Sequence, residues 1–321
     1  MPNLKNSPSP ADGYRGRFAP SPTGPLHAGS LVAALGSWLD ARKNQGKWLL
    51  RIEDIDTPRC IPGADQTIMG QLLACGLQWD EELTWQSKRQ EHYQRALERL
   101  NDQCLLYPCT CSRQTILNTL ESHGIIPDRN QEIVYPGTCR PQTIGSLDLL
   151  SEKGASTKSN SALRLALAPE IVIEFEDLAL GRQTQNLTQE VGDFVLRRRD
   201  GLFTYQLAVV VDDEEQGITH IVRGQDLLSN TARQIYLQNL LGYSHPQYLH
   251  LPIVLDEHGE KLSKQTLATA IHTSTKEQAL NELRKAAAHL GLRDLPDGKD
   301  ISIPEWLLAA TQAWNRSLTF S

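Results

Sequence analysis

The sequence contains no apolar run close to the roughly 20 residues that a membrane-spanning helix needs. It also lacks the basic cluster and apolar segment of a signal peptide at its start. Residues 1–13, "MPNLKNSPSPADG", are polar and proline-rich, and we expect them to form a disordered tail. These absences exclude an integral membrane protein and favour a cytoplasmic protein without a membrane partner.

An excess of positive charge is missing as well. Lys and Arg number 32 against 38 Asp and Glu, which gives a formal net charge of −6. A general nucleic-acid-binding protein has a basic surface, so this balance excludes that class. A local basic track remains at Arg197–Arg199 in "FVLRRRDG". It is a candidate contact for RNA phosphates, and a plain solvated surface is the alternative.

Cysteine is infrequent, with six among 321 residues. A reducing compartment favours free thiols and metal sites over a disulfide framework. We expect three of the six to pack as small apolar side chains, namely Cys60, Cys75 and Cys104.

The other three cysteines have the spacing of a metal site. "CTC" supplies Cys109 and Cys111, and "YPGTC" ends at Cys139. Three thiolates suit a structural Zn²⁺ ion and leave one tetrahedral position to fill. Coordination chemistry alone favours His123 there, because imidazole is a commoner ligand than a phenol. Three free thiols are the alternative.

The sequence does contain an alternation of short apolar runs with helical segments. This alternation predicts an α/β fold with a mostly parallel sheet. The expected strands are 16–22, 47–55, 205–213, 218–224 and 251–256. The expected helices are 31–42, 64–75, 88–103, 230–241 (closed by Gly242), 281–292 and 303–314.

The middle of the chain breaks this alternation with Cys, Pro and polar residues, so we interpret it as an insertion between two halves of the sheet. The length is also enough for two or three structural units. We therefore divide the chain after its tail into a first α/β half, an insertion, a second α/β half and a helical C-terminal region, at 14–104, 105–203, 204–265 and 266–321.

Two segments have the composition of a phosphate site. Residues 17–30, "RFAPSPTGPLHAGS", join a strand to a helix through a Gly/Pro turn, and the unpaired amides at a helix start attract anions. The segment matches neither G-x-G-x-x-G nor the P-loop pattern. Residues 261–265, "KLSKQ", carry two lysines that can neutralise a polyphosphate.

Together these segments resemble the His-Ile-Gly-His and Lys-Met-Ser-Lys-Ser signatures of class I aminoacyl-tRNA synthetases. The strings "RFAPSPTGPLH", "RIEDIDTPR" and "IVRGQDLL" are similar to the glutamyl branch. Ordinary glutamyl-tRNA synthetases continue into a large anticodon-binding portion. This chain resembles the shorter glutamyl-Q enzymes more closely, and "HAGS" and "KLSKQ" fit them too. The resemblance implies a Rossmann-like catalytic domain with a zinc-containing insertion and a short C-terminal helical domain.

The resemblance also implies a reaction. Glutamyl-Q enzymes activate L-glutamate with ATP and Mg²⁺, without needing tRNA, and attach it to the queuosine base of aspartate tRNA. We expect a monomer, a ligase with one structural Zn²⁺. Because the family pairs Cys-x-Cys with a downstream Tyr-x-x-x-Cys, the resemblance makes Tyr135 the fourth zinc ligand.

The substrate residues follow from the same resemblance. It implies glutamate binding by Arg17, Phe18, Ala19, Pro20, Ser21, Glu53, Tyr205 and Arg223. It implies ATP binding by His27, Gly29, Ser30 and Lys264, and catalysis by His27, Lys261 and Lys264.

A buried glutamate needs a cation for each carboxylate and an anion for its ammonium group. Glu53 resembles the residue that holds the ammonium group, and a strand-end salt bridge with Arg51 or Arg59 is its alternative role. Arg17 and Arg223 resemble the carboxylate-binding arginines, whose planar fork gives bidentate hydrogen bonds. The sequence leaves open which of these two arginines reads the side-chain carboxylate.

Three other functions stay open at this point. A small glutamyl-tRNA synthetase would charge a 3′ end and depend on tRNA for activation. A class I-like adenylyltransferase would use the same phosphate site on another acid. A non-catalytic zinc module that binds RNA would form no adenylate at all.

Overall fold

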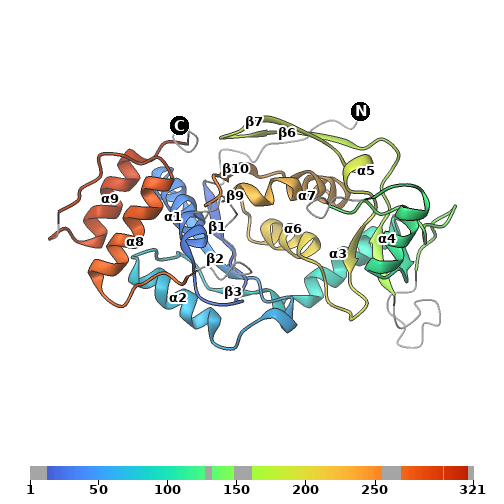
Figure 1. Cartoon of the computed structure of the whole chain (residues 1–321), viewed down its shortest axis with the longest axis horizontal. Coiled ribbons are helices and arrows are strands. Elements are labelled where there is room, and N and C mark those ends of the chain that lie inside the picture. The colour runs from blue at the N-terminus through green and yellow to red at the C-terminus, as the bar shows by residue number, and fades with distance from the viewer. Residues whose placement is uncertain (1–12, 127–131, 148–160, 255–268, 299, 317–321) are drawn as a thin grey trace.

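A computed structural model describes residues 13–126, 132–147, 161–254, 269–298 and 300–316 (Figure 1). The expected tail lies outside these residues except for Gly13. Within the described ranges, no helix combines the length and the apolar content that crossing a membrane requires.

The first sheet contains β1 (Arg15–Phe18), β2 (Lys47–Ile52) and β3 (Thr84–Trp85), and its strands are parallel. The crossover from β1 to β2 is α1 (Ala28–Lys43), which packs against both strands. The apolar side of α1 lies in the largest core of the described molecule, with Leu31, Leu35 and Leu39 almost fully buried. This packing holds the first turn of α1 in space near the carboxyl end of β1.

The second sheet has the order β7-β6-β10-β9. Its strands β6 (Val172–Asp177), β9 (His220–Gly224) and β10 (Gln247–Leu251) are parallel, and β7 (Gly181–Asn186) forms an antiparallel hairpin with β6. The amide of Thr219, just before β9, donates a hydrogen bond of 2.9 Å to the carbonyl of Arg15. The two sheets therefore meet at β1 and β9, as a mostly parallel α/β fold requires.

The third sheet is antiparallel and belongs to the expected insertion. It contains β4 (Leu106–Cys109), β5 (Ala162–Leu165) and β8 (Phe194–Arg197). The short helices α4 (Arg113–Ser122) and α5 (Leu187–Glu190) accompany it. The β6–β7 hairpin falls within the same 105–203 range, yet β6 pairs with β10, so this part of the insertion extends the parallel sheet.

Two strand predictions are wrong. Residues 205–213 form α6 (Tyr205–Glu215), a helix, because five consecutive apolar residues of this segment are buried on all sides and a continuous apolar run does not reveal its period. The strand expected at 251–256 lies earlier, since β10 ends at Leu251, directly before Pro252. Proline has no amide hydrogen for the strand ladder.

The remaining described helices confirm the predictions within a few residues. They are α2 (Ala64–Ala74), α3 (Gln90–Asp102) and α7 (Leu228–Leu241), with short 3₁₀ turns η2 (Thr57–Arg59), η3 (Gln86–Lys88) and η4 (Gln225–Leu227). Gly242 ends α7 at a φ of 67°, in the left-handed region that glycine adopts without strain.

The C-terminal helices α8 (Lys276–His289) and α9 (Ile303–Ala313) pack beside α1, at the left of Figure 1. Pro304 lies in the first turn of α9, as expected, and Ser302 caps that helix. Buried Asp40 of α1 accepts hydrogen bonds from Trp314 (2.9 Å) and Arg316 (2.8 Å), which fasten the end of the described chain to the first sheet.

Candidate active site

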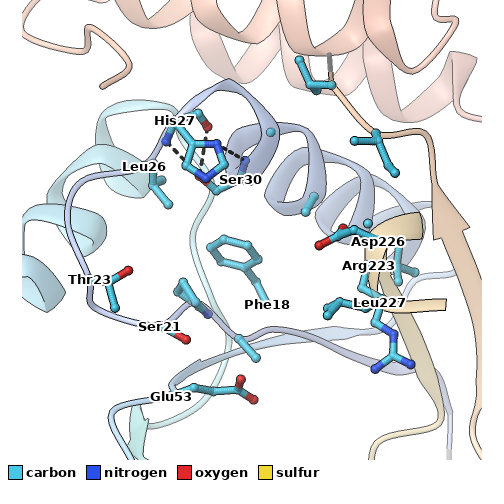
Figure 2. A pocket seen from close by; sticks show the side chains of 18 of the residues that line it. Phe18, Ser21, Thr23, Leu26, His27, Ser30, Glu53, Arg223, Asp226 and Leu227 are labelled. Atoms are coloured by element: carbon cyan, nitrogen blue, oxygen red, sulfur yellow. Dashed lines mark hydrogen bonds between the residues drawn. The ribbon is translucent and has the colours of Figure 1, made fainter. Parts of the chain in front are cut away.

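A cavity of about 440 Å³ opens at the carboxyl ends of β1, β2, β9 and β10, where ligands bind in open α/β sheets. Figure 2 shows His27 and Ser30 on one side of it and Glu53 and Arg223 on the other. Every described residue that the sequence assigned to glutamate or ATP lines this cavity: Arg17, Phe18, Ala19, Pro20, Ser21, His27, Gly29, Ser30, Glu53, Tyr205 and Arg223.

His27 and Ser30 form the start of α1. The Nδ1 atom of His27 accepts a hydrogen bond from the Ser30 amide (3.3 Å), and the Ser30 hydroxyl oxygen accepts one from the His27 amide (2.8 Å). Since Nδ1 is an acceptor, the neutral ring carries its proton on Nε2. The helix start thus brings an N–H donor and the positive end of the helix dipole to the cavity. His27 is thus the N-cap residue of α1, and Ser30 completes the capping box.

Arg17 is buried against a carboxylate. Its Nε lies 3.1 Å from Oδ1 of Asp213, and only 4% of its surface is exposed. Asp213 also accepts a hydrogen bond of 2.8 Å from Arg51, which is fully buried. These two arginines hold the pKa of Asp213 below its usual value, although burial works in the opposite direction. The charge of Arg17 is therefore matched by a protein carboxylate.

Glu53 follows β2 and faces the cavity (Figure 2). Burial raises its pKa to about 7, and the nearby cations Arg51 and Arg17 limit this increase. The Glu53 carboxylate forms an ion pair with Arg51 at 3.4 Å. The salt bridge with Arg51 that the sequence allowed as an alternative role is therefore present, although it is long. Arg59 pairs with Asp56 instead. Glu53 is thus a buried carboxyl group that lines the cavity and makes a long ion pair with Arg51.

Arg223 ends β9 and is as buried as Arg17, with 4% of its surface exposed. Within the described residues its hydrogen-bond partners are all uncharged groups. It donates to Nε2 of His250 (3.1 Å), Oε1 of Gln234 (2.8 Å), the Thr231 hydroxyl (2.8 Å) and the Tyr205 hydroxyl (3.3 Å). Its positive charge is thus held at the cavity without a protein carboxylate against it.

The two predicted lysines, Lys261 and Lys264, lie outside the described residues. The described residues nearest to that segment in the chain have the following contacts. Ile253 and Val254 line it, and Ala270 forms a β-bridge with His27.

The predicted metal ligands lie together at the third sheet. The sulfur atoms of Cys109, Cys111 and Cys139 are within 4.8 Å of one another, with 3.4 Å between the last two. The Tyr135 hydroxyl is 3.4 Å from the Cys109 sulfur and 3.7 Å from the Cys111 sulfur. Ligands at Zn–S distances of about 2.3 Å in a tetrahedron are about 3.8 Å apart, so these four side chains fit a zinc ion. His123, at the exposed end of α4, is not part of this cluster.

The other cysteines follow the packing prediction only in part. Cys75 is fully buried and Cys60 is half-buried. Cys104 is exposed and has a φ of 56°, so the prediction that it packs as a hydrophobe is wrong. It lies in the turn after α3, where the chain reverses toward β4.

The basic track is less available than its sequence suggests. Arg198 pairs with Asp56 (3.1 Å) and Asp200 (2.6 Å), and Arg197 is half-buried. Arg199 is exposed. Because Arg198 is paired with carboxylates and Arg197 is half-buried, this run of three arginines has less positive charge available to bind RNA than its sequence suggests.

Sequence reasoning missed most of the residues behind the cavity and named Arg51 only as a possible partner of Glu53. Asp213 binds Arg17 and Arg51, while His250, Thr231 and Gln234 hold Arg223. Their only signal was a polar residue inside an apolar segment, as in "YLHLP". Their partners are far apart in the chain, so no local pattern indicates which residues meet.

Comparison with known proteins identifies relatives over nearly the whole chain. Residues 14–295 match the family described as class I tRNA synthetases (E and Q), catalytic domain. A glutamyl-Q tRNA(Asp) synthetase of Albidiferax ferrireducens is 50% identical over 311 residues, covering 94% of this chain and 98% of the relative. One of Burkholderia cenocepacia is 52% identical over 309 residues, covering 95% and 97%.

A solved structure has the same fold. It is a glutamate tRNA ligase of Elizabethkingia meningosepticum in complex with its amino acid, with a TM-score of 0.76 and 27% identity. The match covers 96% of this chain and 66% of that chain, so this chain spans about two thirds of the ligase. With relatives half identical over almost their full length, the chain belongs to the glutamyl-Q tRNA(Asp) synthetase family of class I tRNA synthetases.

Proposed function

We propose that this protein activates L-glutamate with ATP in the absence of tRNA and transfers it to the queuosine base of aspartate tRNA. The observation that carries this proposal is a single cavity with Arg223 and Glu53 on one side and the start of α1 on the other. A five-carbon diacid with an ammonium group matches the first side, and a nucleotide phosphate matches the second.

In this proposal Arg223 reads the side-chain carboxylate of glutamate. Its partners are uncharged, so a substrate carboxylate supplies the missing negative charge. Arg17 already has Asp213 and serves to shape the slot. Glutamine is excluded because its NH₂ group only donates and would meet the N–H groups of Arg223. Glu53 holds the ammonium group.

The activation step needs positioning and charge stabilisation more than proton transfer. The α-carboxylate is already ionised at neutral pH. Its oxygen attacks the α-phosphorus of ATP, the bond to the β-phosphate oxygen breaks, and pyrophosphate leaves. His27 Nε2–H and the start of α1 bind the phosphates. We assign charge stabilisation at the phosphates to Lys264 and Lys261, and Mg²⁺ accompanies the triphosphate.

For the transfer step we assign the acceptor nucleoside to a second cavity, of about 600 Å³. Tyr205 lines both cavities and so marks their shared wall. Arg113, which is exposed, also lines the second cavity and suits an RNA backbone. From there a hydroxyl of the cyclopentenediol attacks the adenylate carbonyl, forms an ester and releases AMP.

Labelled glutamate tests this function. We expect ATP–pyrophosphate exchange with glutamate in the absence of tRNA, and transfer of label to aspartate tRNA only when the tRNA carries queuosine. Exchange that requires tRNA, with label at the 3′ end, would indicate a small glutamyl-tRNA synthetase. Exchange driven by another acid in an amino-acid panel would indicate an adenylyltransferase. No exchange with any acid would leave an RNA-binding zinc module.

We further propose that Cys109, Cys111, Tyr135 and Cys139 hold one structural zinc ion, which would stabilise the third sheet. Arg164 holds the phenol in place beside the thiols, because its guanidinium lies 3.8 Å from the centre of the Tyr135 ring. Elemental analysis after purification without chelators should give about one zinc per chain, and a Cys139→Ser variant should give much less. Fewer than about one zinc per three chains in the native protein would contradict the site.

A further inference from the structure

A buried carboxylate and a buried histidine lie in line behind Arg223. Oδ2 of Asp177 is 2.6 Å from Nδ1 of His250, and Nε2 of His250 is 3.1 Å from Nε of Arg223. Asp177 and His250 are at most 1% exposed, so neither exchanges partners with water. Neither residue lines the cavity. Their effect on a substrate must therefore pass through Arg223.

The geometry fixes the tautomer of His250. The Arg223 guanidinium only donates, so Nε2 of His250 must accept through a lone pair. The single ring proton is then on Nδ1 and is donated to the Asp177 carboxylate. Burial lowers the pKa of His250, which keeps the ring neutral. A protonated ring would place N–H against N–H at Arg223.

The Asp177 carboxylate is itself held in place. Its Oδ1 accepts hydrogen bonds from the amides of Ala179 (3.1 Å) and Leu180 (3.0 Å), in the turn of the β6–β7 hairpin. Its Oδ2 accepts a further bond from the His250 amide (3.2 Å). The hairpin of the insertion thus fixes a carboxylate that orients a side chain on β10.

We propose that Asp177 and His250 are positioning residues for the recognition of the glutamate side chain. They fix the Nε–H of Arg223 by a neutral acceptor and so orient the guanidinium. The terminal nitrogen that donates to Thr231 then keeps its second N–H for the substrate carboxylate. This inference rests on the proposed function, in which Arg223 reads that carboxylate.

Placing the carboxylate one ring away from Arg223 has an electrostatic reason. A carboxylate directly on the guanidinium, as Asp213 lies on Arg17, would compete with the carboxylate of the substrate. An imidazole acceptor satisfies the buried N–H without adding a negative charge there. Asp177 then orients the His250 ring and partly compensates the buried positive charge of Arg223 from the far side of that ring.

An Asp177→Asn variant tests the tautomer directly. The amide oxygen of Asn can still accept from the hairpin amides, but its NH₂ would donate to Nδ1 of His250 and move the ring proton to Nε2. Nε2–H would then face the Nε–H of Arg223 or donate to the Thr231 hydroxyl, 3.3 Å away, and in both cases Arg223 would lose its imidazole acceptor. We expect KM for glutamate to rise about 10- to 100-fold, with a smaller change in kcat and weaker discrimination against glutamine. Glu176→Gln, the same chemical change at the exposed neighbouring residue, should keep wild-type values.

Substitution of His250 separates orientation from packing. A His250→Gln variant keeps an oxygen acceptor for Arg223, whereas His250→Leu fills the space without one. We expect His250→Gln to recover a substantial part of the affinity for glutamate that His250→Leu loses. Equal KM values in the two variants would overturn the proposal, because packing alone would then explain the role of the ring.

Nitrogen-15 NMR of the His250 ring gives a readout independent of activity. The native protein should carry the ring proton on Nδ1, and Asp177→Asn should carry it on Nε2. A native ring protonated on Nε2, or a wild-type KM in a folded Asp177→Asn protein, would overturn the inference. Failure of the native protein to activate glutamate would instead contradict the proposed function, and the NMR result would still stand. Thermal unfolding shows that each variant is folded.

Discussion

Arg17 and Arg223 face the same cavity from two neighbouring strands, and both are 4% exposed. Their surroundings differ. The Arg17 side contains Asp213, Asp212, Glu53 and a second arginine, Arg51, so positive and negative charges are paired inside the protein. The Arg223 side contains hydroxyl, amide and imidazole acceptors in direct contact with the guanidinium, and Asp177 lies one ring away. Asp226 also lines the cavity on this side.

The difference separates two uses of a buried arginine. A guanidinium paired with carboxylates holds secondary structure together, because removing either partner leaves an uncompensated buried charge. A guanidinium with neutral partners keeps its hydrogen bonds satisfied but retains a charge for a ligand. We therefore propose that Arg17 serves mainly to stabilise the fold and Arg223 mainly to bind the substrate. The following experiments test this assignment.

The largest effect should come from Arg223→Met. Loss of the cation that faces the substrate carboxylate should lower kcat/KM for glutamate by about 100- to 10,000-fold. The kcat/KM for glutamine should fall much less, so the preference of the enzyme for glutamate over glutamine should decrease. Pyrophosphate exchange with both amino acids measures this. Stability should fall less than in Arg17→Met, because the groups left without a partner are uncharged. Undiminished discrimination between glutamate and glutamine would transfer the role to Arg17.

Arg17→Met should act chiefly on stability. Asp213 would keep Arg51 but lose one of its two cations, so the free energy of unfolding should fall by about 3 kcal/mol. Urea unfolding measures the change. The double variant Arg17→Met/Asp213→Asn should recover part of it, because the buried negative charge is removed as well. An Arg17→Met protein that is as stable as the native protein but accepts glutamine would contradict the proposal that Arg17 acts mainly on stability.

Gln234→Glu should make the Arg223 side resemble the Arg17 side. The new carboxylate would replace an amide oxygen 2.8 Å from Arg223 and compete with the substrate. We expect KM for glutamate to rise on the order of 10- to 100-fold while thermal stability is retained. Gln234→Met is the matched control, because it removes the same hydrogen bonds without adding charge. An equal rise in both variants would show that lost orientation, and not neutralisation, is responsible.

The smallest effect concerns pH and Glu53. Its pKa of about 7 means that the free protein loses the ammonium-binding carboxylate as pH falls below about 7. We expect kcat/KM for glutamate to decrease about tenfold from pH 8 to pH 6, and this dependence should be absent in Glu53→Gln. A native profile that is flat over this range would show that Glu53 does not hold the ammonium group.

The same group links stability to pH. Its folded pKa of about 7 lies above the ordinary value of 4.5, so the folded protein retains a proton that the unfolded chain loses between these values. The free energy of unfolding should therefore decrease as pH rises from about 4.5 to about 7. Glu53→Gln should lack this component, which urea titrations at a series of pH values would show.

Local pattern predicted much of the fold, and chemistry with family resemblance predicted the residues of the cavity. The helices at 31–42 and 230–241 follow from apolar spacing and from Gly242, which are local signals. The segment 205–213 was assigned to the wrong element because a continuous apolar run fits a buried strand and a buried helix equally. Cys104 was predicted to be buried because cysteine often packs as an apolar residue. Its left-handed backbone, which places it in an exposed turn, cannot be recognised from the residue type.

By itself the sequence identified candidates for chemistry. Residue type and spacing marked the clustered cysteines and the Pro/Gly turn before His27, and the family resemblance added Tyr135, Glu53 and the two arginines. Only the tertiary structure decided that Arg17 meets Asp213 while Arg223 meets His250 with Asp177 behind it. Those partners are brought together by strand register and helix packing across distant parts of the chain. Whether a buried charge is neutralised depends on that packing, and no local pattern encodes it.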